Sequence, residues 1–129
     1  MKERVGIAGL CSKFGMALLF LAWSAACSAQ VTDITQAELI QRIKAHKAGL
    51  ILDVRTPEEY AEGHVPGAIN IPYDHLGLRH AEIAAHKNKD IVLYCQSGRR
   101  VGFAAGTLET MGFKKLRHLA GDMGGWLSN

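Results

Sequence analysis

Short apolar runs alternate with amphipathic segments along this chain from Val31 onward. Mostly apolar runs at residues 50–54 and 91–94 predict strands that are buried on both faces. Further short strands are expected at residues 68–71 and 116–119. No internal repeat, low-complexity tract or flexible linker interrupts the alternation.

Helices are expected between these strands. Two segments, residues 35–38 and 56–59, begin with threonine and carry glutamate three positions later, the pattern of a capping box at a helix start. In the first of these helices Ala37, Leu39, Ile40 and Ile43 are expected to face inward. Further helices are expected at residues 81–86 and 101–111. A turn is expected before Trp126, at Gly121, Gly124 and Gly125.

Strands that alternate with helices predict an α/β fold. We expect a mostly parallel central sheet of about five strands, with helices on both faces. In such sheets ligands bind beyond the carboxyl ends of the strands. Cys95 follows one predicted strand, while Asp53 and Arg55 lie at the end of another, so the topology brings them toward one edge.

The composition is that of an ordinary globular domain. The 129 residues are 48% hydrophobic and 21% charged, and the formal net charge is +3. That charge is small, and no cluster of lysine and arginine is interleaved with aromatic residues. We therefore expect no nucleic-acid partner.

The N-terminus has the order of a secretory leader. Basic residues precede an apolar stretch over residues 14–23, and small residues run from Ser24 to Ala29. The apolar stretch is shorter than the roughly 20 residues of a membrane span. We expect residues 1–29 to be a signal peptide that is removed, leaving a domain over residues 31–129 in the periplasm or outside the cell. Cleavage before Cys27, as in a bacterial lipoprotein, is the minor alternative.

Export would leave a single thiol. Cys11 and Cys27 lie in the expected leader, so Cys95 has no partner for a disulfide within its own chain. No Cys-x-x-Cys pair or close pair of histidines accompanies it, and we expect neither a metal nor a cofactor.

The residues around Cys95 indicate a reactive thiol. The predicted strand at residues 91–94 is followed by Cys95, Gln96, Ser97, Gly98, Arg99 and Arg100. Backbone N–H groups of such a turn and the start of the next helix direct positive charge toward the sulfur, which favours the nucleophilic thiolate. The alternative is a small buried hydrophobic residue. The polar, doubly basic sequence after Cys95 favours the functional interpretation.

Several segments together resemble the rhodanese domain. They are residues 52–60 (LDVRTPEEY), 63–72 (GHVPGAINIP), 95–100 (CQSGRR), 111–113 (MGF) and 124–126 (GGW). The resemblance covers about residues 31–129. The chain is similar to single-domain, exported thiosulfate sulfurtransferases of the bacterial phage-shock type.

The resemblance implies a role for each residue of the loop. Cys95 would carry a persulfide, and the backbone amides from Gln96 to Arg100, including those of Ser97, Gly98 and Arg99, would hold the transferred sulfur. Arg100 would close the loop. Thiosulfate would be the donor, and cyanide or a thiol, including a protein thiol, would be the acceptor.

Residues outside the loop are expected to have structural roles. Asp53 is expected to tie down loops near the site, Arg55 to pair with Glu58 or Glu59, and His64 to be a structural residue of its glycine-rich loop. The remaining predictions are of two kinds: surface positions for His75, His80, His86 and His118, and core positions for Phe103, Leu108 and Trp126.

Two other functions stay open. A phosphatase or arsenate reductase of the same fold has a similar loop, but with five residues between cysteine and arginine, whereas four separate Cys95 from Arg100. A sulfane-sulfur carrier or sensor would hold the persulfide without significant turnover.

Overall fold

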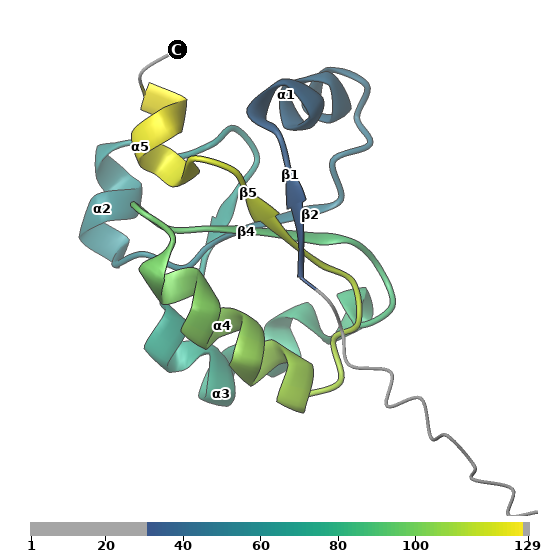
Figure 1. Ribbon diagram of the computed structural model, residues 1–129. Coiled ribbons are helices and arrows are strands. Elements are labelled where there is room, and N and C mark those ends of the chain that lie inside the picture. Colours follow the sequence, from purple (N-terminus) through teal and green to yellow (C-terminus); the bar gives the residue numbers. More distant parts are fainter. Residues whose placement is uncertain (1–30, 128–129) are drawn as a thin grey trace, which may run out of the picture.

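The computed structural model describes residues 31–127 and shows an α/β fold built on one parallel sheet (Figure 1). Five strands lie in the order β1-β5-β4-β2-β3, and every neighbouring pair is parallel. The strands are β1 (Thr32–Ile34), β2 (Leu50–Asp53), β3 (Ile69–Asn70), β4 (Ile91–Tyr94) and β5 (Leu116–Leu119). This confirms the predicted fold class.

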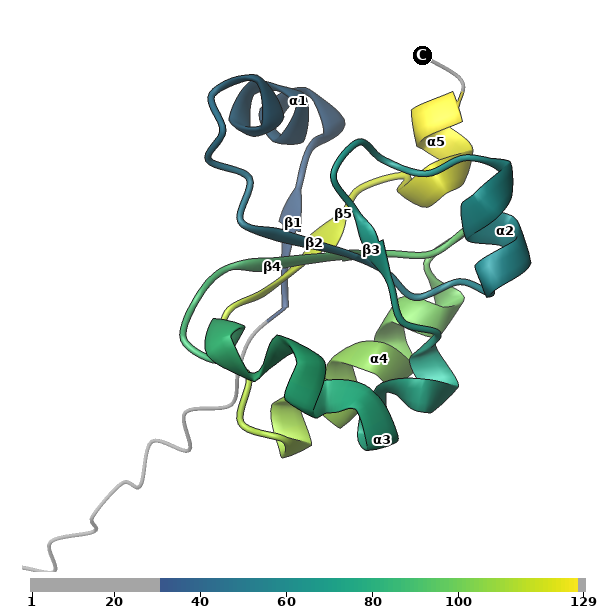
Figure 2. The same cartoon turned by 180° about the vertical axis from the view of Figure 1, so that it is seen from behind.

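Helices cover both faces of the sheet, as Figures 1 and 2 show from opposite sides. The α-helices are α1 (Gln36–Lys44), α2 (Pro57–Glu62), α3 (Leu76–Arg79), α4 (Arg99–Thr110) and α5 (Asp122–Leu127). Two 3₁₀ segments flank α3, namely η1 (Tyr73–His75) and η2 (His80–His86). The predicted helix at residues 81–86 is therefore a 3₁₀ segment that continues α3.

Threonine caps start α1 and α2 as the sequence predicts. The Thr35 hydroxyl accepts from the Glu38 amide, and Thr56 with Glu59 forms a full capping box. Pro57 occupies the first turn of α2, where a missing N–H costs nothing.

Alternation along the strands divides the core into two clusters. Leu52, Leu93 and Cys95 pack with the inner face of α4, whereas Ile51 and Val92 pack with Leu39 of α1 and Met123 of α5 on the other side. Successive strand residues point to opposite faces of a sheet. Cys95 therefore shares a face with Leu93 and lies beside the start of α4.

One strand was not predicted, and three expectations about elements and burial were wrong. Strand β1 was missed because Thr32–Ile34 is too short to show alternation. The glycine-rich segment expected to be a turn forms α5. Phe103 is 64% exposed, because the buried face of α4 consists of Val101, Ala104, Ala105 and Leu108. Ala37 of α1 is also exposed.

The expected leader, including Cys11 and Cys27, lies outside the described residues. Within residues 31–127, no helix has the length and apolar character to cross a membrane.

Candidate active site

Cys95 directly follows β4 at the carboxyl edge of the sheet. It is free and only 1% exposed. The next turn brings the backbone back, so that the Gly98 amide donates to Cys95 Sγ across 3.0 Å. Gly98 has φ +100°, a left-handed conformation that favours glycine, and it precedes the first residue of α4. The Gly98 amide therefore reaches the sulfur because a strand end, a glycine turn and a helix start follow one another here.

Amides at the start of α5 form hydrogen bonds with the backbone of the Cys95 loop. The Met123 amide donates to the Cys95 carbonyl at 3.0 Å, and the Gly124 amide donates to the Gln96 carbonyl at 3.1 Å. A Cβ atom on Gly124 would lie 3.2 Å from that Gln96 carbonyl oxygen, so glycine permits the close approach. Local sequence pattern does not indicate this contact, because the glycines around Gly124 predict only a turn.

Asp122 adds a side-chain contact to the same backbone. Its Oδ1 accepts from the Cys95 amide at 3.0 Å, and its two carboxylate oxygens lie 3.0 and 2.9 Å from His118 Nε2. Asp122 is buried, and His118 is only partly exposed, so the predicted surface position of His118 was wrong. One indication was available in the sequence: Asp122 follows the strand that neighbours β4, at the edge where Cys95 lies.

Arg100 forms an ion pair with Glu59 of α2. Its two terminal nitrogens lie 2.6 and 2.9 Å from the two carboxylate oxygens. Hydrogen bonding from Arg100 lowers the pKa of Glu59 to about 2, against the opposing effect of burial. The same hydrogen bonds raise the pKa of Arg100 above its ordinary value, and the charge of Cys95 adds to that shift. That Arg100 closes the loop stays a prediction, and the structure shows its guanidinium bound to the Glu59 carboxylate.

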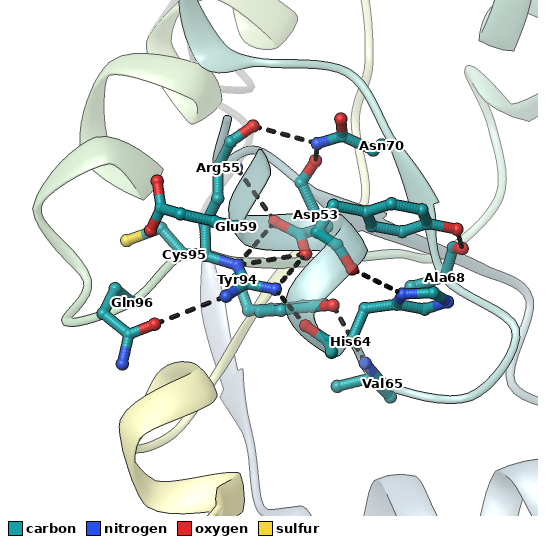
Figure 3. A network of polar contacts seen from close by, with 12 residues as sticks. Asp53, Arg55, Glu59, His64, Val65, Ala68, Asn70, Tyr94, Cys95 and Gln96 are labelled. Atoms are coloured by element: carbon teal, nitrogen blue, oxygen red, sulfur yellow. Dashed lines mark hydrogen bonds and ion pairs between the residues drawn. The ribbon is translucent and has the colours of Figure 1, made fainter. Parts of the chain in front are cut away.

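Arg55 connects three segments around the site (Figure 3). Its guanidinium binds the carboxylate of Asp53, which is fully buried, and donates to the Gly63 carbonyl at 2.7 Å. Arg55 Nη1 also lies 3.4 Å from Gln96 Oε1. The predicted pairing with Glu58 or Glu59 was wrong, since Asp53 is closer along the same strand end. Burial lowers the pKa of Arg55, but the hydrogen bonds and charge of Asp53 outweigh it and raise the pKa overall.

His64 lies away from the sulfur, in the loop after α2. Its ring stacks on Tyr60 with centroids 3.7 Å apart, and its Nδ1 lies 2.9 Å from the Tyr60 carbonyl oxygen. The next residue, Val65, donates its amide to the Tyr94 hydroxyl at 3.0 Å. Burial raises the pKa of Tyr94, so its hydroxyl stays neutral. This network fixes the loop that carries Gly63, the carbonyl partner of Arg55.

A cleft of about 390 Å³ opens beside the Cys95 loop. It is lined by Arg55, Glu59, Glu62, Gly63, Gln96, Met123 and Leu127. Gln96 and Arg99 are both exposed. Ser97 is exposed too, so the polar side chains of the loop face solvent while the sulfur stays sheltered. Arg55 and Gln96 both line this cleft, and Gln96 is the residue that follows Cys95.

Among residues 31–127, no group of three or more His, Cys, Asp or Glu side chains is placed to hold a metal ion.

The fold and the cysteine loop agree with a family comparison. A model of the rhodanese-like domain matches residues 35–129 of the chain. The chain belongs to this family. The match confirms the resemblance to the rhodanese domain, whereas the narrower similarity to exported phage-shock proteins stays a prediction.

Similar proteins are named for sulfur chemistry. A sulfurtransferase of Allochromatium vinosum is 34% identical over 96 residues, which cover 74% of this chain and 88% of that protein. The thiosulfate sulfurtransferase PspE of Escherichia coli is 40% identical over 70 residues, covering 54% of this chain and 67% of PspE.

Two further proteins extend the comparison. The putative sulfur carrier protein YrkF of Bacillus subtilis is 33% identical over 99 residues, which cover 77% of this chain but only 52% of YrkF. The rhodanese domain described here thus spans about half of that relative. The solved structure of a human single-domain sulfurtransferase, TSTD1, has a TM-score of 0.62 and 27% identity, with 78% of this chain and 98% of that chain covered.

Proposed function

We propose that this rhodanese domain is a thiosulfate sulfurtransferase that works by double displacement at Cys95. The Cys95 thiolate attacks the outer sulfur of thiosulfate, the sulfur–sulfur bond of thiosulfate breaks, and sulfite leaves with the electron pair. A persulfide remains on Cys95. An acceptor such as cyanide then attacks the terminal sulfur, leaves as thiocyanate and regenerates the thiolate. Such covalent catalysis gives ping-pong kinetics.

One observation carries the proposal. The Gly98 amide donates to Cys95 Sγ in a loop that enters a helix beginning with two arginines. A fixed amide dipole stabilises a thiolate, and afterwards a persulfide anion, without reorganisation during the reaction. The names of the A. vinosum and E. coli relatives support the same reaction class.

The sulfonate end of thiosulfate needs cationic or hydrogen-bonding partners outside the loop. Arg55 and Gln96 line the cleft beside Cys95, and Arg99 is exposed at the start of α4. We assign the sulfonate to this group of side chains. The acceptor, cyanide in an assay or a small or protein thiol in a cell, would enter by the same cleft.

Replacing Cys95 tests the assignment. Cys95→Ser is expected to abolish thiocyanate formation from thiosulfate and cyanide, and mass spectrometry should find no added sulfur atom after thiosulfate treatment. His75→Gln is the control, because it changes an exposed residue of η1 and leaves the loop unchanged, so thiocyanate formation and the added sulfur should persist. More than trace turnover by a folded Cys95→Ser variant would show that the nucleophile is misassigned.

A sulfur carrier is the second candidate, because the relative YrkF is named as a putative sulfur carrier. A carrier would take one sulfur atom from a donor but pass it on slowly. Steady-state turnover, measured against the rate of a single persulfide-forming step, distinguishes the two. A persulfide that forms without turnover would favour the carrier.

A phosphatase reaction is the third candidate and has less support. Its loop needs room for three phosphate oxygens, and a six-residue loop from Cys95 to Arg100 is one residue shorter than the phosphatase loop. In addition, the Arg100 guanidinium is bound to Glu59. We expect no measurable hydrolysis of aryl phosphates by the unmodified protein.

A further inference from the structure

The feature that the proposed mechanism leaves unexplained is Asp122. It is one of two non-glycine residues with positive φ in residues 31–127, at +53°, and it is 3% exposed. The left-handed conformation is energetically unfavourable for a residue that carries a side chain. Burying a carboxylate costs more, unless it is paired and hydrogen-bonded. A residue that carries both costs at the edge of the candidate active site calls for a function.

The contacts of Asp122 point to the nucleophile. Oδ1 accepts from the Cys95 amide at 3.0 Å. On the neighbouring side, a Cβ atom added to Gly98 would lie 3.0 Å from Asp122 Oδ2. The carboxylate is therefore placed against both ends of the turn, at Cys95 and at the glycine whose amide donates to Sγ.

That placement has an electrostatic consequence. A carboxylate beside the turn opposes a second negative charge, whether on the Cys95 thiolate or on its persulfide. Arg100 at the start of α4 could offset this negative charge, but it is already paired with Glu59. The group that faces Asp122 directly is His118, whose Nε2 lies within 3.0 Å of both carboxylate oxygens.

His118 lies between acidic groups from several elements. Its Nδ1 is 3.6 Å from Oδ1 of Asp33, the residue that pairs with it across β1 and β5. Glu109 of α4 lines the same surface hollow as Asp33 and His118. Among residues 31–127, Asp122 and Asp33 are the acidic groups within ion-pair distance of the ring, and Glu109 lines the hollow beside it. Histidine is also the side chain that ordinarily changes charge near neutral pH.

We propose that Asp122 and His118 are positioning residues for Cys95, in which Asp122 fixes the Cys95 amide and His118, in contact with both carboxylate oxygens, offsets the negative charge of Asp122 so that the sulfur can carry negative charge. The inference rests on the proposed sulfur transfer at Cys95. Its consequence is that the reactivity of Cys95 depends on this pair as well as on the thiol itself.

The rate of Cys95 alkylation by iodoacetamide, measured against pH, tests the proposal. His118→Gln leaves Asp122 uncompensated, so the midpoint should rise by about half a pH unit or more. Asp122→Asn removes the negative charge and keeps an oxygen that can accept from the Cys95 amide, so the midpoint should fall. In the double variant the effect of His118→Gln should largely disappear, because the charge that it neutralises is absent.

Control variants distinguish this electrostatic effect on Cys95 from a merely structural role of Asp122 and His118. His75→Gln replaces an exposed histidine beside Asp74 in η1 and should leave the alkylation profile unchanged. Asn and Gly adopt positive φ more readily than Asp, so Asp122→Asn and Asp122→Gly keep the backbone unstrained. If Asp122→Asn fails to fold, Asp122→Gly should give the same downward shift.

The outcomes are distinct. Opposite shifts for the two single variants, and non-additivity in the double variant, support the proposal. Midpoints that stay at the wild-type value, or that move together in one direction, overturn it. Alkylation needs no sulfur donor, so a protein that forms no thiocyanate but shows the opposite shifts would disprove the proposed function and leave the positioning pair standing.

Discussion

At the scale of single residues, the site consists of charges that neutralise one another near one sulfur atom. Glu59 pairs with Arg100, Asp53 with Arg55, and Asp122 with His118. The three carboxylates come from three different elements, namely α2, β2 and α5. The charge that Cys95 experiences is therefore set by these pairs as well as by the amide of Gly98.

Changing either member of the Glu59–Arg100 pair should move Cys95 reactivity in opposite directions. Glu59→Gln frees the Arg100 charge, so the pH midpoint of alkylation should fall. Arg100→Ala removes a cation and leaves the Glu59 carboxylate unpaired, so the midpoint should rise. Gln retains the capping role at the third position of α2. Arg79→Ala, which breaks an exposed pair with Glu82, is the control. Equal midpoints in all variants would mean that the pair does not act on the thiol.

The same pair should make stability depend on pH in the acid range. The pKa of Glu59 falls from 4.5 to about 2 on folding, so the pair stabilises the protein fully above about pH 4.5 and the contribution is lost toward about pH 2. Since the carboxylate is partly exposed, the contribution is on the order of 1–2 kcal/mol. Urea unfolding should show Glu59→Gln less stable than wild type near neutral pH, with the difference vanishing in acid. A difference that persists at about pH 2 would contradict this.

At the scale of elements, the short helix α5 sets the position of the Cys95 loop. Its first residues contribute the Asp122 carboxylate and the Met123 and Gly124 amides to the backbone of Cys95 and Gln96. Glycines disfavour an isolated helix. Here the hydrogen bonds to the loop compensate for that preference, and the element forms only in the context of the sheet edge.

A methyl group at Gly124 should therefore disturb the loop. In Gly124→Ala the new Cβ would lie 3.2 Å from the Gln96 carbonyl oxygen, and backbone must move to relieve it. We expect a loss of about 1–3 kcal/mol of stability and slower sulfur transfer. Gly102→Ala in α4 is the matched control, because its Cβ meets no atom within 4 Å and alanine should stabilise the helix by about 0.5–1 kcal/mol. Thermal unfolding and thiocyanate assays on both variants check this. Equal behaviour of the two variants would show that the close approach is not important.

Some strands and loops could be predicted from the local sequence pattern, whereas contacts between distant segments could not. The strands around Leu52 and Leu93 were evident because burial on both faces leaves an unbroken apolar run. The cysteine loop was evident because glycine and arginines directly follow a strand end. The contacts of Asp122 with Cys95 and of Glu59 with Arg100 were not evident, because they join residues 27 and 41 positions apart, and nothing local marks which groups meet. Phe103 was misplaced for a related reason: helical spacing alone does not fix which side of α4 meets the sheet.

At the scale of the whole molecule, the rhodanese domain puts Cys95 at one edge of the sheet and buries the rest of the sheet between two apolar clusters. Cys95 is a single buried thiol in residues 31–127. The leader lies outside the described residues, so the expected export of this domain stays a prediction.

Export and sulfur transfer can be measured together on the mature protein. Expressed with its leader in a bacterial host, the protein should reach the periplasm, and its mass should match cleavage after Ala29. Attachment to the membrane through Cys27, with the added mass of a lipid, would favour the lipoprotein alternative. Retention of residues 1–29 on a cytoplasmic product would contradict export.

Thiosulfate should then add one sulfur atom to the mature chain, and cyanide should remove it, because Cys95 would be its sole thiol. An adduct that persists after cyanide, or that forms equally on Cys95→Ser, would contradict a persulfide at this residue.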